Sequence, residues 1–121
     1  MVGFQLGDVA SYGTQAKNAG EKLPFDFSSP AINVLRNLNA DSIVMDIVVT
    51  IKNPFDGTYQ IAVGTPTDNQ KYISYLDIDL TKPGIYIFDK FEKNGIAESL
   101  NVYFIGSATQ GNGMVFFQEF D

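Results

Sequence analysis

The sequence contains no histidine and no cysteine. Without histidine it lacks the commonest general base, the commonest transition-metal ligand and every histidine-based catalytic triad. Without cysteine it has neither a thiol nucleophile nor a disulfide, so its composition carries no information about the redox compartment. Walker, dinucleotide-binding and zinc-site patterns are missing as well. We therefore expect a protein that is not an enzyme and that holds no cofactor and no metal ion.

Positive charge is also scarce. Eight Lys and Arg residues oppose 14 Asp and Glu residues, which gives a net charge of −6 and an isoelectric point near 4.4. A chain this acidic is repelled by a phosphate backbone and by anionic lipids. No stretch approaches the roughly 20 apolar residues of a membrane helix, and the N-terminus lacks the basic start and apolar core of a signal peptide. We expect neither a nucleic-acid partner nor a membrane partner.

What the chain does have is alternation of apolar residues, and it is clearest over residues 42–52. The positions expected on the buried face of this strand are Ile43, Met45, Ile47, Val49 and Ile51. The chain then passes through the turn residues NPFDG at 53–57 into a second alternating run at 59–63. These features together predict a β-hairpin formed by 42–52 and 59–63.

Further short runs suit strands better than helices, since ten Phe and six Tyr accompany few helix formers. Residues 31–38 fit a strand or one helical turn, and we favour the strand. The other expected strands are 75–80, 85–88, 100–105 and 114–120. The last is apolar on both faces, which predicts a place inside a sheet. Six or seven such strands predict an all-β, antiparallel two-sheet sandwich, jelly-roll or immunoglobulin-like, with the strand order left open.

The chain divides into an N-terminal arm, residues 1–29, and a β-sandwich domain, residues 30–121. Glycines at 3, 7, 13 and 20 interrupt every periodic pattern in the arm. Its apolar residues either fold back on the domain or add a strand to a neighbouring chain. The residues expected at an interface are Val2, Phe4, Leu6, Tyr12, Phe25 and Arg36. Arg36 is the single arginine, which more often forms a surface or interfacial ion pair than a substrate clamp.

Two groups of side chains raise the question of chemistry. Asp77 and Asp79 would share a face of the expected strand 75–80 and could approach a cation or a glycosidic bond, but calcium needs six to eight oxygens. A solvated outer face is the simpler interpretation, for these residues and for Asp46. The tyrosines could form a platform for a sugar or could pack in the core. They are Tyr59, Tyr72, Tyr75, Tyr86 and Tyr103.

A resemblance to a known group of proteins lies in the block LNADSIVMDIVVTIKNPFDGTYQIA at 38–62. The block continues into VGTPTDNQKY at 63–72, and the similarity ends in SATQGNGMVFFQEF at 107–120. This pattern resembles that of small structural proteins of tailed bacteriophage virions. The resemblance implies a virion component: a capsid decoration or head-stabilising protein, or a small tail or fibre protein. The arm has no counterpart in the pattern.

From the resemblance we expect a bacteriophage structural protein of the virion, assembled in the host cytoplasm, whose partners are phage capsid or tail proteins. The leading expectation is a capsid decoration (cement) protein that binds the shell as a homo-oligomer, for which a trimer is a suitable count. One alternative is a tail or fibre adhesion module that binds a host surface glycan. A second is a carbohydrate-binding or carbohydrate-active domain.

Overall fold

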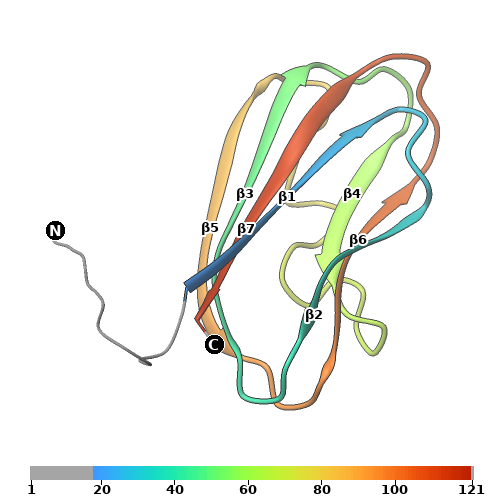
Figure 1. Cartoon of the computed structure of the whole chain (residues 1–121). Helices are drawn as coiled ribbons and strands as arrows, with labels where there is room; N and C mark the ends of the chain where they lie inside the picture. Colours follow the sequence, from blue (N-terminus) through green and yellow to red (C-terminus); the bar gives the residue numbers. More distant parts are fainter. Residues whose placement is uncertain (1–17, 121) are drawn as a thin grey trace, which may run out of the picture.

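The computed structural model describes residues 18–120, with the side chains of 18–20 and of 120 left aside. This part of the chain folds as two antiparallel sheets packed face to face (Figure 1). The strands are β1 (Asn18–Asp26), β2 (Ile32–Leu38), β3 (Ile43–Asn53), β4 (Gln60–Gly64), β5 (Gly84–Lys93), β6 (Glu98–Ile105) and β7 (Asn112–Phe120). Within residues 18–120 no helix is long and apolar enough to span a membrane. The predicted all-β two-sheet sandwich is confirmed.

Successive strands alternate between the two sheets. One sheet has the order β1-β7-β3-β5 and the other the order β2-β6-β4. Each connection between consecutive strands therefore crosses from one sheet to the other. An immunoglobulin domain places its first two strands in one sheet, so the arrangement is that of a jelly roll, with seven strands where that fold usually has eight. A long loop, residues 65–83, joins β4 to β5.

The predicted hairpin of 42–52 with 59–63 is wrong, because β3 and β4 belong to different sheets. The intervening segment is held across the sandwich by burial instead of forming a tight turn. Phe55 is 3% exposed and stacks on Phe25, with ring centroids 5.7 Å apart. Its backbone N–H donates to the Leu80 carbonyl oxygen at 2.8 Å. Residues 53–57 do have the composition of a turn. Burial of Phe55, however, directs the chain from one sheet to the other.

The predicted strand 75–80 is also wrong, because these residues form turns in the loop 65–83. Ile78 and Leu80 are buried, at 4% and 2% exposed, which is why their spacing resembles a strand. Leu76, which the same spacing places with them, is 87% exposed. The loop adds only an isolated bridge from Ile73 to Val63 at the free side of β4.

The buried face of β3 is predicted correctly over its second half. The buried positions there are Ile47, Val49 and Ile51, each at most 2% exposed. In the first half the expected face is wrong, since Val44 is fully buried while Ile43 and Met45 are only partly buried. The pairing of β3 with both neighbours shifts between Val44 and Asp46. This irregularity moves alternate side chains to the other face, as a one-residue slip does.

Strand β1 lies inside the range expected to be an arm. It pairs with β7 over its whole length, from Asn18 opposite Phe120 to Asp26 opposite Asn112. The range 1–29 therefore includes a strand of the sheet. Residues 1–17 of this range lie outside the described residues. The favoured strand at 31–38 is confirmed by β2. β7 lies between β1 and β3, so its predicted place inside a sheet is also confirmed.

Candidate interaction surfaces

Most of the predicted interface residues do not lie on a described surface. Four of them are outside the described residues: Val2, Phe4, Leu6 and Tyr12. Phe25 is 4% exposed, with its ring centroid 5.7 Å from that of Phe55 and 5.1 Å from that of Phe104. The ring belongs to the core between the sheets, so the expectation that Phe25 is a surface anchor is corrected. Its alternation with Phe27 across a polar segment did not distinguish a core strand from an arm.

Arg36 forms ion pairs within its own chain. Its Nη1 donates to Glu21 Oε2 at 2.9 Å, and its Nε donates to the Glu119 carboxylate. Glu119 is 1% exposed and the Arg36 side chain is 27% exposed. Arg36 thus joins β2 of one sheet to β1 and β7 of the other. A nearly buried carboxylate needs such a partner, so this arginine joins the two sheets, and its expected place at an interface stays a prediction.

The expected acidic pair serves the turns of the loop 65–83. Asp77 accepts a hydrogen bond from the Ser74 N–H at 2.8 Å, while Asp79 accepts from the Thr81 N–H at 3.0 Å and the Thr81 hydroxyl at 2.6 Å. These bonds from Thr81 lower the pKa of Asp79. The two carboxylates are engaged separately: Asp79 forms an Asx turn with Thr81, and Asp77 binds the N–H three residues before it. Among residues 18–120 no group of three or more acidic side chains is arranged to hold a metal ion.

The tyrosines do not form an exposed platform, so that hypothesis is wrong. Tyr72 and Tyr103 are 2% and 8% exposed. Burial raises the pKa of Tyr72 to about 12, with smaller contributions from nearby carboxylates. Tyr59 stacks between Phe55 and Phe104 at 5.3 and 5.2 Å between ring centroids. Tyr86 also packs against the core, whereas Tyr75 in the loop 65–83 is only partly buried. Packing, the alternative that the sequence had left open, therefore accounts for the other four.

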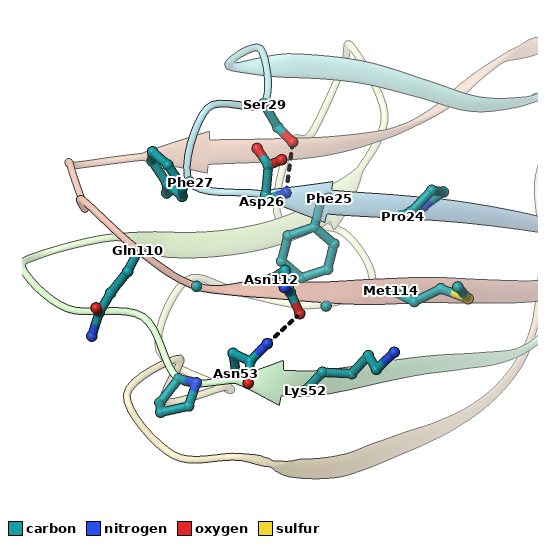
Figure 2. Close-up of a pocket in the computed structure, with 13 residues that line it drawn as sticks. Pro24, Phe25, Asp26, Phe27, Ser29, Lys52, Asn53, Gln110, Asn112 and Met114 are labelled. Carbon is teal, nitrogen blue, oxygen red and sulfur yellow. Dashed lines mark hydrogen bonds between the residues drawn. The ribbon is translucent and has the colours of Figure 1, made fainter.

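An open groove lies at one end of the sandwich, where three loops meet (Figure 2). Its volume is about 870 Å³. The lining comes from the end of β1, the end of β3 and the start of β7: Pro24, Phe25, Asp26, Phe27, Ser29, Lys52, Asn53, Pro54, Gln110, Gly111, Asn112, Gly113 and Met114. Asn53 Nδ2 donates to Asn112 Oδ1 at 3.3 Å. The residues are remote in sequence, so no local pattern indicates the groove.

Glycine shapes the floor of this groove. A side chain at Gly113 would meet the Thr50 carbonyl oxygen and the Phe25 ring, and one at Gly111 would meet the Phe55 ring. The segment GNG at 111–113 is therefore more than a turn, because its glycines let the backbone pass directly over buried aromatic rings. Asp56 fixes the adjoining loop by accepting from the Thr109 N–H at 2.6 Å, and hydrogen bonds from Thr109 lower the pKa of Asp56.

The second surface is the outer face of the four-stranded sheet, beside the edge strand β5. Ile85 and Ile87 are 67% and 65% exposed, whereas Tyr86 and Phe88, which alternate with them along the strand, pack against the core. Sequence could not show which pair faces outward, because all four side chains are apolar. At the end of this surface Asp46 stands opposite Asp89 on the neighbouring strand. A side-chain hydrogen bond with Asp89 raises the pKa of Asp46, and burial raises it further.

No protein-family model matches the chain, and no curated protein matches it. Solved structures do. A chain in the "Acidic stable capsid structure of Helicobacter pylori bacteriophage KHP30" has a TM-score of 0.68 and 14% identity, with 86% of this chain and 87% of that chain covered. A chain of the "Cyanophage Pam1 capsid asymmetric unit" has a TM-score of 0.65 and 12% identity, with 98% and 94% covered. A chain of the "Capsid of Ralstonia phage GP4" has a TM-score of 0.53 and 13% identity, with 94% and 90% covered. At such identities the likeness is one of fold, and this chain shares its fold with chains from phage capsid structures.

Proposed function

We propose that this chain is a structural component of a bacteriophage virion, a capsid decoration (cement) protein that binds the shell as a homo-oligomer and is assembled in the host cytoplasm. The observation that supports this is the fold likeness to chains from phage capsid structures, which covers almost all of both chains. The matched chains are thus about as long as this one, and the likeness is not to a module inside a much larger shell protein. The resemblance of residues 38–72 and 107–120 to virion structural proteins agrees with it.

The chemistry of the described residues suits a role in binding rather than in catalysis. The chain has no histidine or cysteine, and its acidic pair Asp77 and Asp79 is occupied in loop turns. Exposed apolar side chains, by contrast, are present on both sheets, including Ile32 and Val34 of β2 at 61% and 59% exposed. Many copies that each bind weakly can hold firmly to a shell through multivalency. Exposed apolar surface of this kind is what such binding requires.

We place the contact with the shell in residues 1–17, directly before β1. The alternating Val2, Phe4 and Leu6 are suited to strand addition on a neighbouring protein, in which the backbone supplies affinity and the side chains fill pockets. Burying three such side chains contributes roughly 25 cal/mol per Å² of apolar surface before the cost of ordering the segment.

Reconstitution tests this function. Particles stripped of the protein are mixed with the purified full chain and with a chain that begins at Lys17, and both mixtures are pelleted. We expect the full chain to bind saturably, in fixed proportion to the major shell protein, and the shortened chain to stay in the supernatant. Leu76→Ser, in an exposed loop, is a matched control that binds like the parent. Failure of the full chain to bind intact shells would exclude the decoration role.

The end groove favours a second candidate function, a tail or fibre adhesion module for a host glycan. The groove combines the exposed ring of Phe27 (44%) with the amides of Asn53 and Asn112. Rings that stack on sugars and amides that bind hydroxyls are typical of glycan sites. A glycan array with the full chain and with Asn112→Ala separates the candidates. Binding that the substitution abolishes supports adhesion, while an empty array supports decoration.

A further inference from the structure

The outer face of the four-stranded sheet is patterned in rows that run across the strands. An acidic row comprises Asp89, Asp46 and Gln118; the Ile87 row comprises Ile87, Val48, Phe116 and Lys22; the Ile85 row comprises Ile85, Thr50, Met114 and Pro24. Beyond the Ile85 row the next outward side chain on β3 is Lys52, which is exposed. Two mainly apolar rows, which also include Lys22 and Thr50, therefore lie between a carboxylate pair at one end and Lys52 at the other.

This face is open to solvent in the described part of the chain. Ile85 and Ile87 are two-thirds exposed, and the β3 and β7 members of both rows are partly exposed. Lys52 takes part in none of the ion pairs among residues 18–120, which involve Arg36 and Lys93. Among residues 18–120, no strand pairs with the other side of β5. An apolar, unpaired edge of this kind is typical of an interaction site.

We propose that this face binds a second copy of the chain through a two-fold axis that crosses the strands between the two apolar rows. In a two-fold interface each patch meets its own copy in reverse order. The Ile87 row then meets the partner's Ile85 row, and the acidic row meets the end of the face that carries the partner's Lys52. Sheets packed in this way lie about 10 Å apart with strands roughly 30° from alignment, so the rows meet approximately and not atom by atom.

Charge complementarity favours this axis over a two-fold axis that also lies in the plane of the face but runs along the strands. A two-fold along the strands would exchange β5 with β1 and place Ile87 against Lys22. It would also place Asp46 against Gln118, so that the carboxylates would be covered without a cation. The axis across the strands brings both carboxylates toward the partner's Lys52, twice by symmetry. A lysine there would also offset the repulsion between Asp46 and Asp89, which adds to the hydrogen bond with Asp89 and to burial in raising the pKa of Asp46.

The size of the face sets the expected affinity. Four strands spaced about 4.8 Å apart, each some eight residues long at about 3.4 Å per residue, give a face of roughly 500 Å² per copy. Stable interfaces bury about 800 Å² per partner. We therefore expect a dimer that forms reversibly, in the micromolar range or above, and that becomes populated at the high local concentration of an assembled particle.

Sedimentation equilibrium of the full chain, from about 1 to 500 μM, tests the pairing. We expect a monomer–dimer equilibrium. Lys52→Glu should weaken it at least tenfold because three like charges then meet at each end, whereas Lys82→Glu, the same change at an exposed loop position, should leave it unaltered. Adding Asp89→Lys to Lys52→Glu should restore part of the lost affinity. Ile87→Ser should abolish the dimer with little change in melting temperature, since the side chain is exposed.

Three results would overturn the proposal: a monomer at every concentration, a trimer, or equal effects of Lys52→Glu and Lys82→Glu. A fourth result would also overturn it, by showing that residues 1–17 of the same chain cover the face. In that case the full chain would be monomeric and a chain beginning at Lys17 would dimerise. None of these measurements uses a particle, so their outcome is independent of whether the protein decorates a shell.

Discussion

Strands β1 and β5 are the two edges of the same sheet, and they are protected in different ways. β1 is tied to the rest of the domain by the Phe25 ring in the core and by Glu21, which pairs with the arginine of β2. It also carries Pro24, which has no N–H to offer a further strand. β5 shows Ile85 and Ile87 to solvent, and its charged residues lie toward its other end.

The difference between these edges shows which edge of the sheet is held by contacts within the domain and which edge exposes apolar side chains to solvent. β1 contributes to folding because its inward side chains contact both sheets. β5 contributes mainly through Tyr86 and Phe88, whereas Ile85 and Ile87 on its outer side are exposed. Edge strands with apolar exposed faces are avoided in isolated domains because they associate. The exposed face of β5 therefore favours a protein that works in an assembly.

The largest effect is expected from removing β1. A chain that begins at Phe25 lacks most of this strand, so we expect it to be unfolded by circular dichroism. A chain that begins at Lys17 keeps the strand and should melt within a few degrees of the full chain. A cooperative melt from the chain beginning at Phe25 would show that β1 is as dispensable as an arm.

Phenylalanines near the two edges give the next contrast. Phe25→Ala should cost about 3–5 kcal/mol of unfolding free energy, as large-to-small changes of buried aromatic residues do. Phe91→Ala on β5 should cost within about 0.5 kcal/mol, because Phe91 is 64% exposed. Urea denaturation of both variants measures this. Equal losses would mean that the two edges are equally integrated into the core.

Arg36→Met tests the ion pairs that fasten β1 and β7 to the other sheet. Breaking a buried pair costs about 3–5 kcal/mol, and because Arg36 is partly exposed we expect a smaller loss, about 2–3 kcal/mol. Adding Glu119→Gln removes the stranded carboxylate and should recover part of that loss. Urea melts of the single and double variants report the difference. If the double variant is less stable than the single one, Glu119 has another partner.

The smallest effect is expected at the Asp46–Asp89 pair beside β5. Because the pKa of Asp46 is raised above 3.8, ionisation costs the native state stability above that raised pKa, and the cost disappears as pH falls toward 3.8. Asp46→Asn should therefore raise the melting temperature slightly at pH 7 and not at pH 3.

Asp79→Asn is the control, because it should change the melting temperature at pH 7 in the opposite direction. The pKa of Asp79 is lowered, so its contribution is present above 3.8 and is lost as pH falls through the lowered value. Melting curves of both variants from pH 3 to 8 should diverge at neutral pH. If both substitutions destabilise at pH 7, Asp46 is stabilised as a carboxylate by a group not yet identified.

The alternation of apolar and polar residues predicted those features that depend only on neighbouring positions in the sequence. The inward positions Ile47, Val49 and Ile51 follow from period two, as does the class of the fold. The irregularity at Val44 and Asp46 could not be predicted, because it depends on pairing with two neighbouring strands. The supposed hairpin failed for a related reason. A jelly roll pairs strands distant in sequence, so turn residues between β3 and β4 do not imply that these strands are neighbours.

The candidate surfaces were less accessible to sequence reasoning than the fold. Phe25 and Arg36 were expected at an interface, and the sequence could not show that both have contacts within the chain. The groove gathers residues from three loops, and the Ile85 row gathers one residue from each of four strands. Both exist only once the strand order is known, which the sequence left open.

Cryo-electron microscopy of purified particles, from a phage whose genome encodes this chain, tests the proposed virion role most directly. The account predicts density for the seven-stranded sandwich in many copies on the outer surface of the capsid, attached through the segment before β1. The same map should show the outer face of the β1-β7-β3-β5 sheet against a second copy. Density for the chain on the tail alone would contradict decoration, and its absence from the particle would contradict any virion role.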